Sequence, residues 1–152
     1  MARVYLTDTE GMDVIYTVDQ AVGTGCPNKR DDVLLVQFFL KVKSEGPEKS
    51  EFTPPGRGPI KTDGLWGPAS QAYLNHFLAV SLAKVKAFPL KQDGRVDPVV
   101  GGRFTGPKTG HVFTIIALNS AYGNVRGSNA LKDITTDPVF PQELRPALKA
   151  NQ

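Results

Sequence analysis

Acidic side chains are the first groups in this sequence that could carry acid–base chemistry. Asp31 and Asp32 are adjacent, so on a helix their carboxylates point in different directions and cannot share one proton. We interpret them as negative charges at the N-terminal end of a helix. Glu45, Glu48 and Glu51 fall in a stretch rich in Pro and Gly, which is a poor frame for an acid and a base at a fixed separation. We therefore expect no catalytic pair of carboxylates.

The two histidines and the single cysteine are also isolated from one another in the sequence. His76 and His111 show no spacing typical of metal ligands, and no motif links either of them to a nucleophile. Cys26 cannot form an intrachain disulfide, and we interpret it as a small thiol that is buried or half-buried, with a reactive thiol or an intermolecular disulfide as the alternative. Its segment, GTGCPNKR, lacks the spacing of a phosphate-binding loop. The sequence thus predicts no enzyme, no metal ion and no cofactor.

Composition and charge are those of an ordinary globular chain. The 152 residues are 40% hydrophobic, which suits one compact domain with decorated ends. Lysine and arginine number 18 against 15 acidic residues, for a net charge of +3, and the basic residues are scattered. Nucleic-acid surfaces normally carry a dense basic stripe. Nucleic acid is therefore not an expected partner.

The N-terminal sequence bears on localisation. MARVYLTDTEG lacks the apolar core of a signal peptide, and the sequence has no run of about 18 or more apolar residues. These features predict synthesis in the cytoplasm and no membrane partner. A virion or a secretion-type particle is the alternative final site.

Hydrophobic spacing predicts a mainly α fold in three parts. Alternating β-branched and aromatic residues on both sides of a turn predict a β-hairpin in residues 1–21. Apolar residues at helical spacing predict three helices in residues 22–125. The expected helices cover 30–43, 68–84 and 108–124. A proline-rich tail, 126–152, is expected to be an extended arm with one short helical turn at PQELRPAL.

The ends of these helices carry recognisable signals. Asp31 or Asp32 is expected to cap or charge the first helix, and Thr109 to cap the third. The long segment 43–59 is too rich in Pro and Gly for regular structure, and its length suggests a functional loop or an insertion.

Two segments repeat an Asp-Gly turn. Asp63-Gly64 precedes the second helix, and Asp93-Gly94 begins a second copy whose Gly-Pro-x-Thr half stands at 106–109. In such turns Asp accepts backbone amide hydrogen bonds, and Gly adopts a conformation that is strained for other residues. Simple helix capping explains both copies. The first copy also contains Trp66, the single tryptophan, which would be core if buried and a stacking platform if exposed.

These residues resemble the peptidoglycan-binding-like three-helix module. The resemblance rests on a V-x-x-[LV]-Q first helix (Val33 to Gln37), a D-G-x-[FYW]-G-x-x-[ST] turn (Asp63 to Ser70) and a following helix that ends in an aromatic residue, Phe77. It covers about residues 22 to 122. It implies a three-helix bundle, preceded here by the hairpin and followed by the C-terminal arm.

The resemblance also implies a non-catalytic groove that holds the glycan or the peptide stems of the cell wall. Matched by position, the groove residues are Gln37, Asp63, Leu65, Trp66, Tyr73 and Asn75. Trp66 and Tyr73 would stack on sugar faces, whereas Gln37 and Asn75 would satisfy amides and hydroxyls. The alternatives are that Trp66 fills the core and that Gln37 only ties down the turn.

Two functions remain in competition at this point. The first is a module that binds peptidoglycan, for which an exposed Trp66 and an exposed Tyr73 beside an open groove are expected. The second is a structural component of a phage virion, a tail or a contractile injection-type assembly. That component would use the module as a scaffold and contact other subunits through the hairpin and the C-terminal arm.

Overall fold

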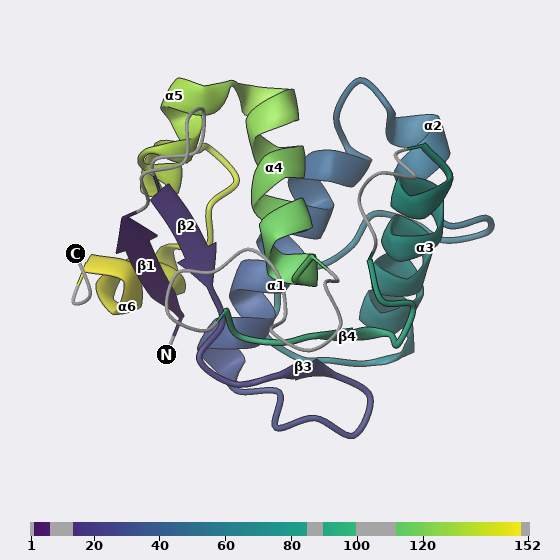
Figure 1. Cartoon of the computed structure of the whole chain (residues 1–152), viewed down its shortest axis with the longest axis horizontal. Coiled ribbons are helices and arrows are strands. Elements are labelled where there is room, and N and C mark those ends of the chain that lie inside the picture. The colour runs from purple at the N-terminus through teal and green to yellow at the C-terminus, as the bar shows by residue number, and fades with distance from the viewer. Residues whose placement is uncertain (1, 7–13, 85–89, 100–111, 150–152) are drawn as a thin grey trace.

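The chain is mainly helical, as expected, with a short pair of strands at its N-terminal end (Figure 1). The computed structural model describes residues 2–6, 14–84, 90–99 and 112–149. The helices of these residues are α1 (Arg30–Ser44), α2 (Lys49–Phe52), α3 (Pro68–Lys84), α4 (Thr114–Arg126), α5 (Ser128–Leu131) and α6 (Arg145–Lys149), with 3₁₀ turns η1 (Ile134–Thr136) and η2 (Gln142–Leu144). The strands are β1 (Arg3–Leu6), β2 (Val14–Thr17), β3 (Val22–Gly23) and β4 (Arg95–Val96).

Helix α1 is the centre of the molecule. It packs against α4 and α3, and Figure 1 shows it between them. Its consecutive residues Val33, Leu34, Leu35 and Val36 point around the whole helix, and all four are buried. A helix that is apolar on every side is stable only when other elements surround it. This sequence property explains why α1 is the core helix.

The predicted hairpin is confirmed in its two strands. β1 and β2 are antiparallel, with Arg3 opposite Thr17 and Leu6 opposite Val14; the connection between them lies outside the described residues. On the other side of β2, the buried side chain of Asn119 in α4 satisfies the backbone of Tyr16. Tyr16 N donates to Asn119 Oδ1 at 2.8 Å, and Asn119 Nδ2 donates to Tyr16 O at 2.7 Å. The hairpin is thereby fixed to the helical core.

Asp31 and Asp32 both lie in the first turn of α1, which confirms that they charge this end of the helix, but the expectation that one of them caps it is corrected. The N-cap of α1 is Lys29, which makes no side-chain capping bond. Asp32 is fully buried, and its carboxylate accepts hydrogen bonds from the backbone amides of Asp19 and Gln20, at 2.8 and 3.0 Å. A carboxylate needs such partners when it leaves water. Asp32 therefore anchors the chain that follows β2 instead of capping its own helix.

The segment 43–59 is not wholly irregular, which corrects a second expectation. It contains the single helical turn α2, whose Phe52 is buried and lies 5.9 Å from the ring of Phe77 in α3. The contact between Phe52 and Phe77 anchors this segment to the core, despite its Pro and Gly content.

The second and third predicted helices both exist, as α3 and α4. Helix α3 begins at Pro68 and ends at Lys84, as predicted. Helix α4 begins only at Thr114, and the predicted cap, Thr109, lies outside the described residues, as does His111. Val112 forms an isolated bridge with Leu90 instead of belonging to the helix. The three predicted helices thus correspond to α1, α3 and α4, which share one core.

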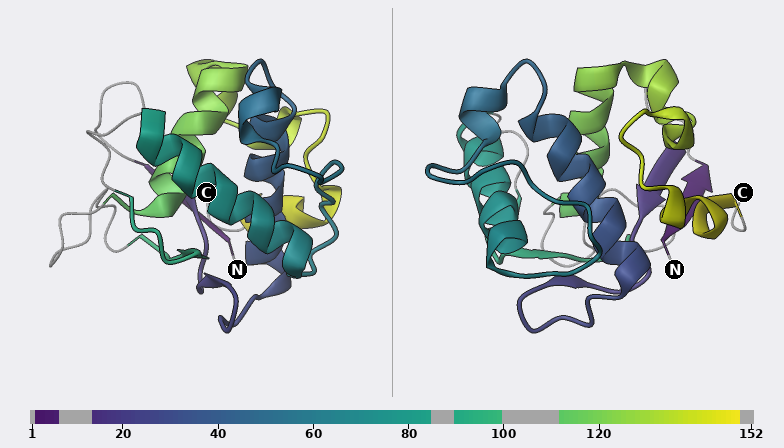
Figure 2. Two further views of the ribbon diagram at one scale, coloured as in Figure 1. Left: turned by 90° about the vertical axis from the view of Figure 1, so that its right-hand side faces the viewer. Right: turned by 180° about the vertical axis from the view of Figure 1, so that it is seen from behind.

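The C-terminal segment is not an extended arm, which is the third correction. The predicted helical turn near PQELRPAL is confirmed as η2 and α6, but the described residues from α5 to α6 pack on the domain (Figure 2). Leu131, Ile134, Phe140, Leu144 and Leu148 are all buried. The prolines lie at the turns of this segment. Its widely spaced apolar residues are buried against the core, and this burial folds the segment back onto the domain.

The hairpin, the helices and the C-terminal segment share one hydrophobic core. A polar contact also joins two of these parts, because Tyr122 in α4 and Arg126 both donate to Asp137 Oδ2 at 2.9 Å. None of the described helices combines the length and the apolar character needed to cross a membrane.

Candidate functional site

The Asp63-Gly64 turn is built around Gln37, a fully buried side chain of α1. Gln37 Oε1 accepts a hydrogen bond from Gly64 N at 2.9 Å. Its Nε2 lies 2.9 Å from Leu65 O, 3.0 Å from Ser70 Oγ and 3.2 Å from Asp63 Oδ1. Every polar atom of this amide is used inside the protein. Gln37 therefore ties down the turn, the alternative that the sequence left open, and does not face a groove.

Asp63 serves the same turn. Its Oδ1 accepts a hydrogen bond from Leu65 N at 3.0 Å. This backbone hydrogen bond and the contact with Gln37 lower the pKa of Asp63 below its ordinary value, against the effect of desolvation. Gly64 has φ of 75°, which glycine adopts without strain.

The second Asp-Gly turn has the same construction, as its sequence predicts. Asp93 Oδ1 accepts from Arg95 N at 3.2 Å, and Gly94 has φ of 67°. The second half of this repeat, at 106–109, lies outside the described residues. The Asp-Gly repeat is therefore a repeated backbone turn.

Trp66 is partly buried and packs against the core with part of its indole accessible. Its Nε1 donates a hydrogen bond to Gln71 Oε1 at 2.8 Å. The same oxygen accepts from Thr24 N and Thr24 Oγ1, both at 2.9 Å. The side chain is thus neither a fully enclosed core residue nor a freely rotating surface residue.

Gln71 also reaches the second Asp-Gly turn. Its Nε2 donates to Gly94 O at 2.7 Å and to Asn75 Oδ1 at 3.0 Å. One side chain of α3 therefore joins Trp66, the loop at Thr24 and the turn at Gly94. Gln71 was not among the residues that the sequence pattern indicated. Its position five residues after Trp66 was visible, but its other partners come from distant parts of the chain and leave no local signal.

Two open hollows meet at Trp66, Gly67 and Pro68. The first has a volume of about 310 Å³ and is also lined by Asp63 and Leu65; we call it the Leu65 hollow. The side chain of Leu65 is 68% exposed there. The exposed side chain of Leu65 and the partly exposed indole of Trp66 together form a small apolar surface.

The second hollow, which we call the Asn75 hollow, is more polar. It has a volume of about 580 Å³, and its polar lining residues are Thr24, Asn28, Gln71 and Asn75. Asn75 is exposed, at the rim. The Trp66 surface, defined as Trp66 with these two hollows, therefore offers one aromatic side chain flanked by amide and hydroxyl groups.

Tyr73 is not part of this surface, which corrects the expectation that it is exposed and stacks on a sugar. Its side chain is 2% exposed, and its hydroxyl donates to Gly58 O at 2.5 Å. Desolvation by burial raises the pKa of Tyr73. Tyr73 lies on the buried face of α3, whereas Gln71 and Asn75 lie on a different face of the same helix. Of the six candidates, the structure brings Asp63, Leu65, Trp66 and Asn75 to the surface around the hollows, and it buries Gln37 and Tyr73.

The described residues contain no group of three or more His, Cys, Asp and Glu side chains that could hold a metal ion. His76 Nε2 lies 2.7 Å from Glu51 O and is part of a surface contact between α2 and α3. Cys26 is partly buried, near Thr24.

No family model matches this chain, and comparison with curated proteins and with solved structures gave no match either.

Proposed function

We propose that this chain is a non-catalytic module that binds the glycan of peptidoglycan at the Trp66 surface. The observation that carries the proposal is the position of Trp66, partly exposed between two hollows and held by Gln71. An apolar aromatic face can cover the C–H face of a sugar ring, and a side chain that is already fixed loses little entropy on binding.

The neighbours of Trp66 fit such a ligand. Thr24, Asn28 and Asn75 line the hollow with hydroxyl and amide groups, which can hydrogen-bond the hydroxyl and acetamido groups of a glycan. Leu65 extends the apolar contact on the other side. Shallow, open hollows with few charges suit a neutral chain-like ligand.

The alternative function is a scaffold subunit of a virion, a tail or an injection-type assembly. It requires a C-terminal arm that is free to wrap a neighbouring subunit. Leu144 and Leu148 of that segment are buried in the same core as the helices. This packing removes one of its two supports, and no specific contact favours it over glycan binding.

Sedimentation with insoluble peptidoglycan tests the proposal. The wild-type chain should sediment with the polymer, and Trp66→Ala should lose at least about tenfold in affinity, as expected for removal of a central aromatic contact. Trp66→Phe should retain part of the binding. Because the indole also packs on the core, the unfolding midpoint of each variant is measured in parallel. Failure of the wild-type chain to sediment, or full binding by Trp66→Ala, would overturn the proposal.

A further inference from the structure

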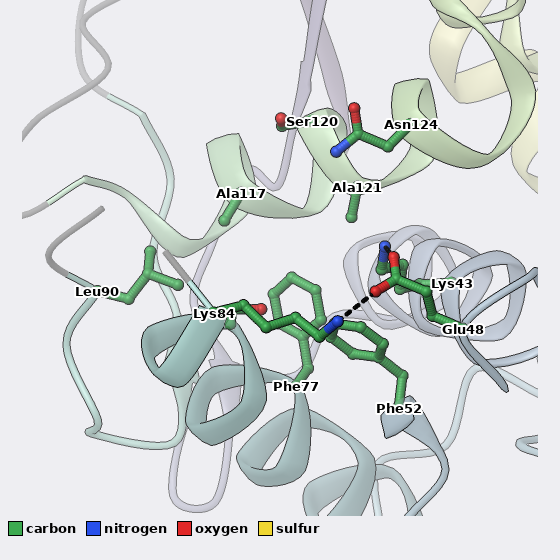
Figure 3. A pocket seen from close by; sticks show the side chains of 11 residues that line it. Lys43, Glu48, Phe52, Phe77, Lys84, Leu90, Ala117, Ser120, Ala121 and Asn124 are labelled. Atoms are coloured by element: carbon green, nitrogen blue, oxygen red, sulfur yellow. Dashed lines mark hydrogen bonds and ion pairs between the residues drawn. The ribbon is translucent and has the colours of Figure 1, made fainter. Parts of the chain in front are cut away.

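A third hollow, which shares no lining residue with the other two, lies between the C-terminal parts of α1 and α3 and one face of α4 (Figure 3). Its volume is about 380 Å³. The buried side chains of Phe52, Phe77 and Leu90 form apolar walls, and the small residues Ala117 and Ala121 of α4 leave the space open. Small-molecule sites are typically concave, mostly apolar and about 300–1,000 Å³ in volume. We call this space the α4 cavity.

Two ammonium groups lie at one side of the α4 cavity. Lys43 Nζ is 2.9 Å from Glu48 Oε1, and Lys84 Nζ is 2.6 Å from Glu48 Oε2. Both nitrogens also lie over the ring of Phe52, at 4.6 and 6.0 Å from its centroid. The ring and the shared carboxylate therefore hold the two ammonium groups in place (Figure 3).

At this side of the cavity two lysines, Lys43 and Lys84, are paired with two carboxylates, Glu48 and Glu51. Glu48 is the carboxylate that lines the cavity, against two lysines. Glu51 contacts Lys84 at 2.6 Å but is not part of the lining. The hydrogen bonds from Lys84 and then Lys43 lower the pKa of Glu48 to about 2, because both ammonium groups favour its ionised form.

Lys43 is an unusual wall residue, because only 6% of it is exposed. Burying an ammonium group is unfavourable, and an apolar side chain of similar length would serve stability at least as well. The cavity also contains the polar side chains of Ser81, Ser120 and Asn124, for which the described residues provide no side-chain hydrogen bond. The cavity thus has hydrogen-bonding groups that the fold itself does not use.

We propose that the α4 cavity binds a small amphipathic carboxylate. Its apolar body, about the size of one ring with a short chain, lies against Phe52 and Phe77. Its carboxylate is received by Lys43 and Lys84, which then share their hydrogen bonds between the ligand and Glu48. This site is separate from the Trp66 surface and does not depend on the proposed glycan binding.

A titration with two matched probes tests this proposal. The full ¹⁵N-labelled chain is titrated with 3-phenylpropionate and with 3-phenylpropionamide, which differ in charge and little in shape, and amide chemical shifts are followed. The carboxylate should bind at least about tenfold more tightly than the amide, because charge-assisted hydrogen bonds are the stronger kind. The largest shifts should fall on the residues that line the cavity.

Variants assign the preference to its source. Lys43→Met should abolish the preference for the carboxylate, whereas Lys41→Met, which removes a lysine paired with Glu45 on the outside of α1, should keep it. If Lys43→Met does not fold, Lys84→Met is the second variant, because that side chain is 37% exposed. Ser81→Phe, which fills the cavity, should block both probes.

The controls separate this proposal from the glycan proposal. Trp66→Ala should bind the carboxylate as the wild-type chain does. Equal affinity for the two probes, the absence of saturable shifts, or shifts centred on the Trp66 surface would each overturn the assignment.

Discussion

The indole Nε1 of Trp66 donates a hydrogen bond to Gln71 Oε1 over 2.8 Å. Gln71 is in turn fixed by Thr24 and by Gly94 O. The orientation of the single tryptophan thus depends on three segments that are far apart in the sequence. A binding surface gains from such fixation, since less conformational entropy is lost when a ligand arrives.

Removing this amide should release the indole. We expect Gln71→Ala to be destabilised by about 1 kcal/mol, the usual net contribution of a partly exposed hydrogen bond. The emission of Trp66 should move to longer wavelength, and its quenching by acrylamide should increase. The chain contains one tryptophan, so fluorescence reports on this turn alone. Unchanged emission and quenching in Gln71→Ala, matching those of the surface control Gln20→Ala, would contradict the described role of Gln71.

The buried amide of Gln37 should matter for stability. In Gln37→Leu the backbone groups Gly64 N and Leu65 O lose their partner, and buried polar groups without partners cost about 1–3 kcal/mol each. We expect a loss of about 2–3 kcal/mol in the free energy of unfolding, measured by urea denaturation. The exposed Gln20→Leu should change it by less than about 0.5 kcal/mol. Equal effects of the two substitutions would show that Gln37 does not organise the turn.

The second Asp-Gly turn allows a matched pair of glycine substitutions. Gly94 and Gly25 both have positive φ, of 67° and 77°. A Cβ at Gly94 would lie 2.9 Å from Asn75 Oδ1 and 3.0 Å from Gln71 Nε2, whereas a Cβ at Gly25 would meet nothing within 4 Å.

Both alanine variants should therefore lose about 1 kcal/mol from backbone strain. Gly94→Ala should lose more than Gly25→Ala, and should also alter the fluorescence of Trp66 through Gln71. Thermal unfolding and emission spectra check both statements. A Gly94→Ala variant with the stability and the spectrum of Gly25→Ala would be inconsistent with the contact between this turn and α3.

Local sequence signals predicted the parts of the fold that depend on local chemistry. Pro68 after Gly67 marked the start of α3 correctly, and Asp63 and Asp93 marked two turns with the same hydrogen bond. The fold of the C-terminal segment was not predicted because its prolines suggested an arm, whereas Phe140 is buried against the ring of Phe38 in α1. That contact depends on packing between distant segments, which no local pattern reveals.

In the candidate site, too, the sequence predicted the residues with a local signal and not those whose exposure depends on packing. Trp66 was identified because a lone tryptophan in a turn is visible in the sequence. The sequence did not distinguish Tyr73 from Asn75, two residues apart on one helix, although the structure buries the first and exposes the second. The direction in which α3 faces α1 decides this difference, and it depends on the whole core.

The loss of folding stability at acidic pH should depend on Glu48. Its pKa in the folded chain is lowered from 4.5 to about 2, first by Lys84 and then by Lys43. A carboxylate with a depressed folded-state pKa stabilises the fold above its unfolded-state value, and this contribution is lost as the pH falls from 4.5 toward 2.

We therefore expect the urea midpoint to fall over this pH range in the wild-type chain and to fall less in Glu48→Gln. The effect should be modest, because the Glu48 side chain is 38% exposed and solvent screens its ion pairs. Glu45→Gln, which removes a carboxylate paired with Lys41 on α1, is the control. The same pH slope in Glu48→Gln and in the wild-type chain would argue against the two-lysine contact.

The most direct test of the central claim uses Trp66 itself as the reporter. The full chain is titrated with soluble glycan fragments of peptidoglycan while the tryptophan emission and its quenching by acrylamide are recorded. Glycan binding at the Trp66 surface predicts a saturable change in emission and protection from acrylamide. Asn75→Ala should shift the titration to higher ligand concentration. An emission and a quenching constant that stay unchanged at every fragment concentration would contradict the claim.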